Sequence, residues 1–221
     1  MRKPQAEPLQ NGERRVVVKA PAKLPYLVMG YHVPTLSDNP KTPDQAWEPY
    51  ALDVLAGVLS GNDSARLNQK LVRETSLAVD VGAGYDSTSR GREALFELEV
   101  TPSEGKSVTE LETALIEQIE KIKTDGVTQQ ELDRVKAAVI AADVYQRDSM
   151  FYQAMQIGQL ETMGYSWRLL KEYPEKLKAV TSEQIQAVAK KYLVKDNMSV
   201  ATLDPQPVDP NAKPQGKPHV H

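Results

Sequence analysis

Residues 49–102 read PYALDVLAGVLSGNDSARLNQKLVRETSLAVDVGAGYDSTSRGREALFELEVTP, and this stretch decides the fold. In its first part, apolar residues recur at spacings of three and four, which predicts a helix with one wide apolar face. Those residues are Tyr50, Val54, Leu55, Val58 and Leu59. Pro49 suits the first helical position, where its missing N–H is not needed, and Gly61 suits the position just past the end. We therefore expect a buried helix that ends at Gly61.

The rest of the stretch predicts a second helix followed by two strands. Residues 62–64 are Asn, Asp and Ser, whose side-chain oxygens suit a helix N-terminus, and the helix is expected to end near Arg73 and Glu74. Beyond it the apolar period becomes two, which is typical of strands with one buried and one wetter face. The buried positions are expected to be Val79, Val81, Ala83 and Tyr85 in the first strand and Phe96, Leu98 and Val100 in the second.

Residues 15–33 predict a strand, a turn and another strand. The three segments are RVVVKA, PAKLP and YLVMGYHV. In the second strand Leu27, Met29, Tyr31 and Val33 share one face, and Pro34 ends the strand because proline cannot donate to the ladder. We expect these two strands to pair as a hairpin.

The second half of the chain is mainly helical. An apolar stripe predicts a helix from Val108 to Ile122, ended by Asp125 and Gly126. Thr128 with Glu131, and Thr181 with Gln184, have the spacing of capping boxes, which predicts that two further helices begin there. The first of these is expected to reach about Arg147 and to run on, or restart, through Met150–Met163. Residues 166–178 predict a short helix interrupted near Pro174, and Met198–Leu203 a final strand.

These elements predict a single folded domain. We interpret residues 1–13 as a linker, residues 14–204 as one α+β domain and residues 205–221 as a disordered proline-rich tail. Strands joined by hairpins and a long helical region, without regular βαβ alternation, predict a two-layer sandwich. Its sheet should be mostly antiparallel, with helices packed on one face.

Composition excludes several classes of function. The 221 residues carry a formal net charge of −3, and no basic stripe interleaves with aromatic residues, so nothing points to nucleic acid as a partner. No run of about 18 apolar residues exists, so we expect no membrane span. The N-terminus does not resemble a signal peptide. If the parent protein is exported, we expect its signal to lie outside this chain, and a cytoplasmic location stays open.

The residue types that usually carry hydrolytic chemistry are scarce. The chain has no cysteine and three histidines, which are His32, His219 and His221. No H-x-x-E-H arrangement in either direction places two imidazoles on one helix, so we predict no metal site and no catalytic residue in this chain. His32 is interpreted as a strand residue with a hydrogen bond. The two C-terminal histidines are interpreted as incidental tail residues, with weak metal binding as the alternative.

The glycines of residues 82–84, the serines and the methionine-rich segment are also interpreted without a catalytic role. Gly82 and Gly84 lie in a strand pattern rather than before a helix, so they predict a close backbone approach or a bulge instead of a phosphate loop. The serines lack a nucleophile-elbow context. Met150, Phe151, Met155 and Met163 indicate either core filling or a surface that faces a partner.

Arg73 is the one candidate for substrate contact. It ends an apolar helix immediately before a strand, where an exposed guanidinium could reach over the sheet edge to a peptide carbonyl or carboxylate. The alternative is a last-turn cation that complements the helix dipole, paired with a nearby acid. The residues alone leave both open.

The chain resembles the second-half domain of the pitrilysin (insulinase-like) zinc metallopeptidases, which include mitochondrial processing peptidase. The resemblance rests on the order of several short segments over about residues 14–204. They are Tyr50-Ala51-Leu52 through Leu59-Ser60-Gly61, Ser64-Ala65-Arg66-Leu67, Leu71-Val72-Arg73-Glu74, Gly126-Val127-Thr128 with Glu131-Leu132, Leu160-Glu161-Thr162 with Gly164, and Thr181 to Tyr192.

The resemblance implies a two-part enzyme that closes around a peptide. One half carries the inverted zinc motif, whose histidines and a downstream glutamate hold zinc, and the other half has no metal and contributes to the substrate chamber. This chain resembles the metal-free half. The family's metal-free half often offers an arginine and a later tyrosine to the substrate. Arg73 matches the arginine, but the tyrosine position falls at Val79 or Asp80, and Tyr85 lies too far along.

Three functions follow as hypotheses. The first is the non-catalytic half of a zinc metalloendopeptidase in the periplasm or outside the cell, which is expected to be inactive without its zinc-bearing domain or subunit. The second is a scaffold subunit on the same fold, as in the family's respiratory-complex members. The third is an independent peptide-binding module. Peptide binding by strand addition at a sheet edge, and a homo-oligomer, are compatible with the resemblance.

Overall fold

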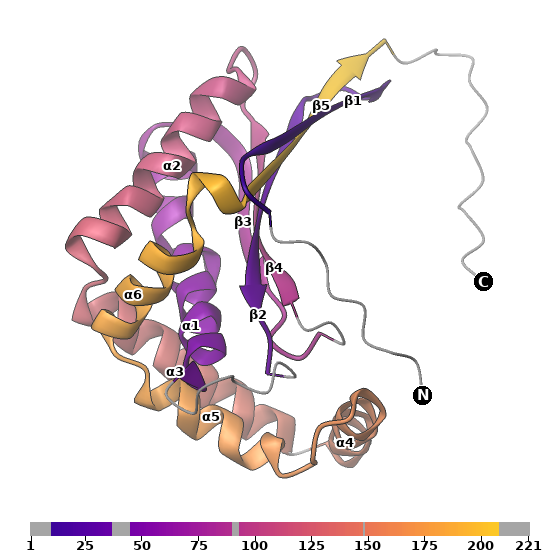
Figure 1. Cartoon of the computed structure of the whole chain (residues 1–221), viewed down its shortest axis with the longest axis vertical. Helices are drawn as coiled ribbons and strands as arrows, with labels where there is room; N and C mark the ends of the chain where they lie inside the picture. The colour runs from indigo at the N-terminus through magenta and orange to yellow at the C-terminus, as the bar shows by residue number, and fades with distance from the viewer. Residues whose placement is uncertain (1–9, 37–44, 90–92, 148, 208–221) are drawn as a thin grey trace.

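The computed structural model describes residues 10–36, 45–89, 93–147 and 149–207 (Figure 1). Its strands are β1 (Arg14–Pro21), β2 (Tyr26–Pro34), β3 (Ala78–Tyr85), β4 (Glu93–Pro102) and β5 (Met198–Gln206). Its helices are α1 (Glu48–Ser60), α2 (Val108–Asp125), α3 (Gln129–Arg147), α4 (Met150–Met163), α5 (Leu169–Ala179) and α6 (Ser182–Tyr192). Two short turns are the π-helical η2 (Asn68–Glu74) and the 3₁₀ turn η3 (Lys195–Asn197). Most of the predicted tail, with His219 and His221, and residues 1–9 of the predicted linker lie outside the described residues.

The sheet has the order β1-β5-β2-β4-β3. Every neighbouring pair is antiparallel except β1 and β5, which are parallel. Helices α1, α2 and α6 cover one face of this sheet and leave its other face open, and α4 lies beyond the end of the sheet, toward the open side (Figure 1). The predicted α+β sandwich, with a mostly antiparallel sheet, is therefore confirmed.

The predicted hairpin between the first two strands is wrong. β5 lies between β1 and β2, pairing with both, although it comes from the far end of the chain. The apolar alternation of β2 shows only which of its faces is buried, and β5 buries Met198 and Val200 beside it. β1 is left as an edge strand with Val16, Val17 and Val18 exposed. Which strand fills the central place is decided by distant residues, so the local pattern could not reveal it.

The core lies between the sheet and helices α1, α2 and α6, which pack against its strands. The predicted inner faces of β2 and β4 are buried, and so is the apolar face of α1. Residues with essentially no exposed surface include Leu27, Met29, Leu52, Leu55, Leu59, Phe96, Leu98, Leu111, Leu115 and Ile122. Burying a side chain of this size contributes roughly 1.5–3 kcal/mol, so this layer is the main stabilising element of the fold.

The start of β3 differs from its predicted alternation. The register shifts between Ala78 and Asp80, because Ala78 pairs with Pro102 and Asp80 pairs with Thr101. Val79 is the extra residue of this bulge and is 58% exposed, whereas Ala78 and Val81 are buried. A bulge inserts one residue and turns it out of the ladder, which is why a strict period of two misplaced Val79 in the core.

The predicted helix boundaries are mostly confirmed. Both capping boxes form, since the Thr128 and Thr181 side chains accept from the backbone three residues on. α4 restarts after Ser149, whose side chain accepts from the Tyr152 N–H. The prediction that this helix is interrupted near Pro174 is wrong, because α5 continues through that proline.

The second predicted helix begins later than expected. The Asn62 side chain accepts from the Ser64 N–H at 2.9 Å, so residues 62–64 form a turn rather than a helix cap. Helical backbone starts only at Arg66 and continues as the π-helical η2.

Both predicted ends of the domain make backbone contacts. In the segment predicted as a linker, Gly12 N–H donates to the Asp196 carbonyl at 2.9 Å, and the Gln10 amide donates to the Met198 carbonyl at 2.8 Å. β5 runs to Gln206, past its predicted end at Leu203. Pro205 fits there because β2 no longer pairs with β5 beyond Leu203, so no N–H is needed on that side.

Candidate functional site at the Arg73 end of β3

Arg73 lies at the end of η2, beside the first residues of the edge strand β3. Its side chain is 53% exposed, and its Nη2 lies 3.7 Å from Oδ2 of Asp63, which is 95% exposed. The structure thus contains the acidic neighbour that the alternative interpretation expected. An exposed pair at this distance is worth well under about 1 kcal/mol, so it leaves the guanidinium available to another acceptor.

The turn between η2 and β3 fixes where Arg73 lies. Leu77 N–H donates to the Leu71 carbonyl at 2.8 Å, and Thr75 Oγ1 donates to the Lys70 carbonyl at 2.7 Å. Ser76 has a φ of 51°, in the left-handed region that a non-glycine residue seldom occupies. This tight turn holds the last turn of η2 against the start of β3, so Arg73 stays near the sheet edge.

The outer edge of β3 is open only in part. Ser60 Oγ, at the end of α1, accepts from the Ala83 N–H at 2.7 Å and donates to the Ala83 carbonyl at 3.2 Å. Because both backbone groups of Ala83 bond to Ser60, they point away from β4, and in an antiparallel ladder Val81 points the same way. The edge is therefore closed at Ala83, and its open part adjoins Val79 and Val81, next to Arg73.

The helix-free face of the sheet is acidic near this edge. Glu97 and Glu99 of β4 and Asp80 of β3 are exposed there. Gly82 gives Glu99 its room, since a Cβ at Gly82 would lie 2.9 Å from Glu99 Cγ. The neighbour at Gly82 is thus a side chain and not the backbone that was predicted to approach it, and the bulge of β3 lies at Val79. The Tyr26 hydroxyl donates to Glu99, and burial together with this carboxylate raises the pKa of Tyr26 to about 12. This face can accept cationic or hydrogen-bond-donating groups.

The position expected for the family's tyrosine holds no equivalent. Val79 is the bulged residue and Asp80 is an exposed carboxylate. Tyr85 lies at the opposite end of β3, where its hydroxyl donates to the Pro34 carbonyl at 2.5 Å. Arg73 therefore has no aromatic hydroxyl beside it from β3.

The described residues contain no cluster of three or more histidine, cysteine, aspartate or glutamate side chains that could hold a metal ion. His32 lies in β2, and its carbonyl accepts from the Asn197 amide at 2.6 Å. Ser60 and Ser149 have structural roles, as an edge bond and a helix cap. What this site offers chemically is recognition, through a guanidinium and a sheet edge.

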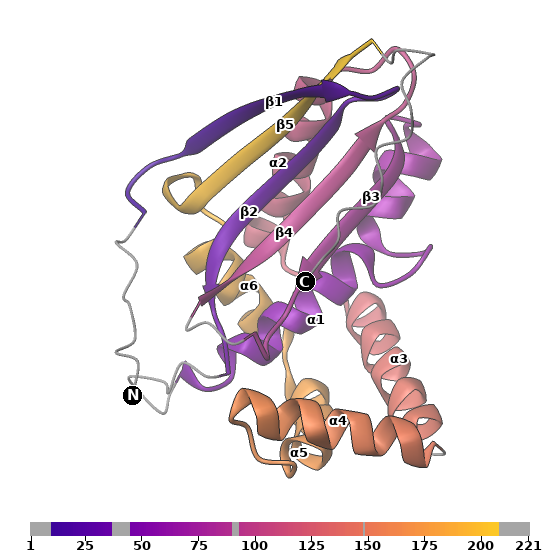
Figure 2. The same cartoon turned by 90° about the vertical axis from the view of Figure 1, so that its right-hand side faces the viewer.

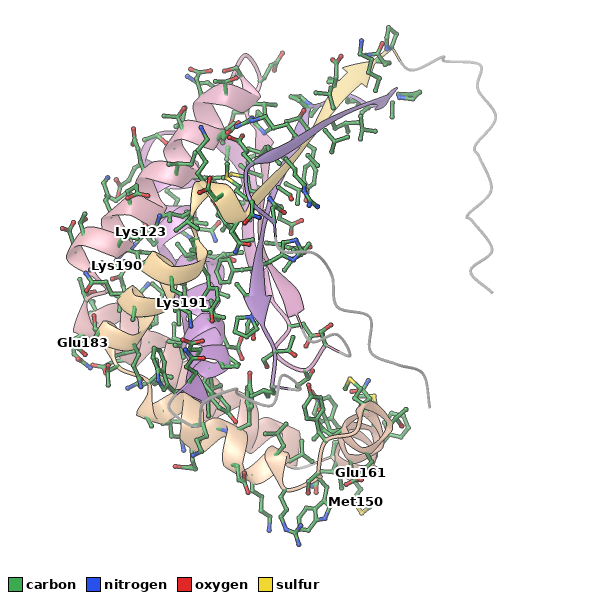
Figure 3. The ribbon with its side chains drawn as sticks, in the orientation of Figure 1. Lys123, Met150, Glu161, Glu183, Lys190 and Lys191 are labelled. Carbon is green, nitrogen blue, oxygen red and sulfur yellow. The ribbon has the colours of Figure 1, made fainter. Side chains whose placement is uncertain are left out.

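Helix α4 exposes apolar side chains at one end of the domain. Met150 and Phe151 are 87% and 80% exposed, and Figure 3 shows Met150 at the outer surface, far from the labelled lysines of α2 and α6. Core filling is therefore wrong for these two residues. Their exposure fits the other interpretation, a surface that faces a partner.

The chain matches the family model described as the peptidase M16 inactive domain over residues 1–139. This chain belongs to that family. Solved inactive peptidase domains, including one from a Bordetella parapertussis zinc protease, share the fold described above, and the resemblance inferred from the sequence is confirmed.

Solved structures of bacterial proteases and of a protease's inactive domain have the same fold. A protease from Helicobacter pylori is 23% identical, with a TM-score of 0.79, and the match covers 90% of this chain and 46% of that one. The inactive peptidase domain of a Bordetella parapertussis zinc protease is 21% identical, with a TM-score of 0.71, over 90% of this chain and 99% of that one. The periplasmic protease PqqL of Escherichia coli is 20% identical, with a TM-score of 0.67, over 89% of this chain and 21% of that one. No curated protein matches the sequence.

These lengths show that this M16 domain corresponds to part of several relatives. It spans about half of the H. pylori protease and nearly all of the B. parapertussis domain. Within the described residues, every helix is too short or too polar to cross a bilayer.

Proposed function

We propose that this M16 domain is the metal-free half of a zinc metalloendopeptidase and forms one wall of its peptide chamber. The observation that carries the proposal is its membership of the inactive-domain family, together with its span of only 46% of the H. pylori protease. In this proposal the zinc and the H-x-x-E-H motif belong to the other half, which is a domain of the same protein or a separate subunit. The periplasmic location of PqqL supports a location outside the cytoplasm.

The proposed role of Arg73 is to bind the substrate backbone near the chamber. Its half-exposed guanidinium lies beside the open part of the β3 edge, so a peptide strand added there would place a carbonyl or carboxylate within its reach. Main-chain hydrogen bonds to β3 would supply affinity with little sequence preference. The acidic face beside the edge would favour peptides that carry basic side chains.

Reconstitution tests this proposal. We expect the chain alone to hydrolyse no peptide and to hold no stoichiometric zinc, measured with a quenched fluorescent peptide library and by elemental analysis. Addition of the H-x-x-E-H-bearing half, taken from the adjoining coding sequence or the neighbouring gene, should produce hydrolysis. Arg73→Ala should then lower kcat/KM about tenfold or more, while Lys70→Ala, on the same exposed turn, should not.

Two results would contradict it. Zinc-dependent hydrolysis by the chain alone would overturn the assignment as a metal-free half. If neither the adjoining coding sequence nor a neighbouring gene contains H-x-x-E-H, and no partner restores hydrolysis, the domain is a scaffold instead. Unchanged kinetics for Arg73→Ala in an active complex would remove only the role of Arg73.

A further inference from the structure

A cavity of about 610 Å³ lies at the opposite end of β3 from Arg73. Helices α3, α4 and α5 extend beyond the end of the sheet there (Figure 2). β3 separates the two places by eight residues, which is roughly 25 Å at about 3.3 Å per residue. The aliphatic part of the cavity wall includes Val139, Ile157, Leu160, Leu169, Leu170 and Leu177, and the side chains of Gln153 and Gln156 also line the cavity.

One end of the cavity is polar and acidic. The Tyr173 hydroxyl donates to Oδ2 of Asp53 and lies 2.7 Å from Ser87 Oγ. Asp86 also lines the cavity, and its Oδ1 accepts from the Thr88 backbone and hydroxyl at 2.9 and 2.8 Å. Burial, and then the nearby Asp86 charge, raise the pKa of Asp53.

The acidic end has no basic partner among the described residues. Among the described residues, Tyr173 is the hydrogen-bond partner of the Asp53 carboxylate, through Oδ2. Asp53 also lines the cavity. Lys171 also lines the cavity, but its Nζ lies over the Trp167 ring, 5.7 Å from the ring centroid. Asp53 is partly buried and Asp86 is exposed, and among the described residues neither carboxylate forms an ion pair. A carboxylate that is partly withdrawn from water is stabilised by a counter-charge.

We propose that this cavity binds the lysine side chain of an apolar peptide segment. The aliphatic walls suit the lysine stem, and the ammonium group would reach Asp53 and Asp86 at the acidic end. The volume exceeds one side chain, and the rim continues onto the exposed apolar residues Ile157 and Trp167. A peptide with apolar residues around the lysine would cover this rim, whereas a free amine would not. The site goes beyond the proposed protease role and does not depend on a zinc-bearing half.

Calorimetric titration of the full 221-residue chain tests the inference. The probes are a capped pentapeptide of alanine and leucine with a central lysine, the same peptide with norleucine in place of lysine, and n-butylamine. We expect the lysine peptide to bind at least tenfold more tightly than either of the others. Asp53→Asn should abolish the preference for lysine over norleucine, and the exposed matched control Asp125→Asn should retain it.

A second variant keeps the inference testable if Asp53→Asn does not fold. Ile157→Trp enlarges a half-exposed rim residue and should weaken both peptides without changing the far-ultraviolet circular dichroism spectrum. Equal affinity for the lysine and norleucine peptides would overturn the inference. Binding of n-butylamine as tight as that of the lysine peptide would overturn the peptide as occupant, and a lysine preference unchanged in Asp53→Asn would overturn the site.

Discussion

The Ser60 hydroxyl bonds to both backbone groups of Ala83, accepting from its N–H at 2.7 Å and donating to its carbonyl at 3.2 Å. Ser60, at the end of α1, thus occupies the backbone hydrogen-bonding groups of one residue on the outer edge of β3. Without Ser60, these groups could pair with another strand. Natural sheets commonly protect their edges, because unpaired N–H and carbonyl groups invite association. The open remainder of the β3 edge is short and adjoins Arg73.

Removing this hydroxyl should open the edge. We expect Ser60→Ala to lower the free energy of unfolding by about 1 kcal/mol, since a partly buried hydrogen bond is lost. Amide hydrogen exchange at Ala83 should also become faster. Chemical denaturation and exchange measured by NMR check this, with Ser64→Ala, an exposed serine of the same region, as the control. Unchanged protection of Ala83 would show that Ser60 does not close the edge.

Arg73 should matter little for stability. We expect Arg73→Ala in the isolated chain to change the free energy of unfolding by less than about 0.5 kcal/mol, because its pair with Asp63 is exposed and long. Urea denaturation measures this directly. A loss above about 1 kcal/mol would mean that Arg73 is structural, and a loss of turnover in the reconstituted enzyme would then not indicate substrate contact.

Low pH should weaken the ion pair between Arg66 and Glu131. Arg66 donates two hydrogen bonds to Glu131, at 2.8 and 2.7 Å. Burial acts to raise the pKa of Glu131, but these bonds and those from Thr128 outweigh it and lower the pKa to about 2. The folded-state pKa is thus below the ordinary value of 4.5, so the stabilisation is complete above about pH 4.5 and is lost as the pH falls toward 2.

The glutamine variant isolates this effect. Between pH 7 and pH 3, Glu131→Gln should lose about 1–2 kcal/mol less stability than the unaltered chain, after allowance for solvent screening. Glutamine still suits the capping box, so the change removes mainly the charge. Glu117→Gln, on the exposed face of α2, serves as the control. An identical acid dependence in the Glu131 and control variants would contradict the assignment.

The bulge in β3 predicts opposite responses at two valines. Val79→Thr should change stability by less than about 0.5 kcal/mol because its side chain is 58% exposed. Val81→Thr should cost about 1–2 kcal/mol because it buries a hydroxyl in the core. Thermal denaturation of the two variants distinguishes the observed register from strict alternation, in which both valines would be buried and both changes would be costly.

The sequence by itself determined the class of fold and most element boundaries. Apolar residues spaced by two indicate strands, and apolar residues spaced by three and four indicate helices. These patterns, and the capping boxes at Thr128 and Thr181, involve residues that are close together in the sequence. These local signals are strong where one face of an element is buried. They placed α1, α2, α6 and β4 correctly and identified Arg73 as an exposed candidate, whose role in binding substrate is still a prediction.

Only the tertiary structure decided which distant segments meet. β5 enters between β1 and β2 from the end of the chain, and Tyr173 reaches Asp53 across 120 residues to build the acidic end of a cavity. The one signal of that cavity in the sequence was a charged residue, Asp53, within the otherwise apolar stretch of α1. Such contacts depend on how whole layers pack and on which strand completes a central position, and no local spacing of residues carries that information.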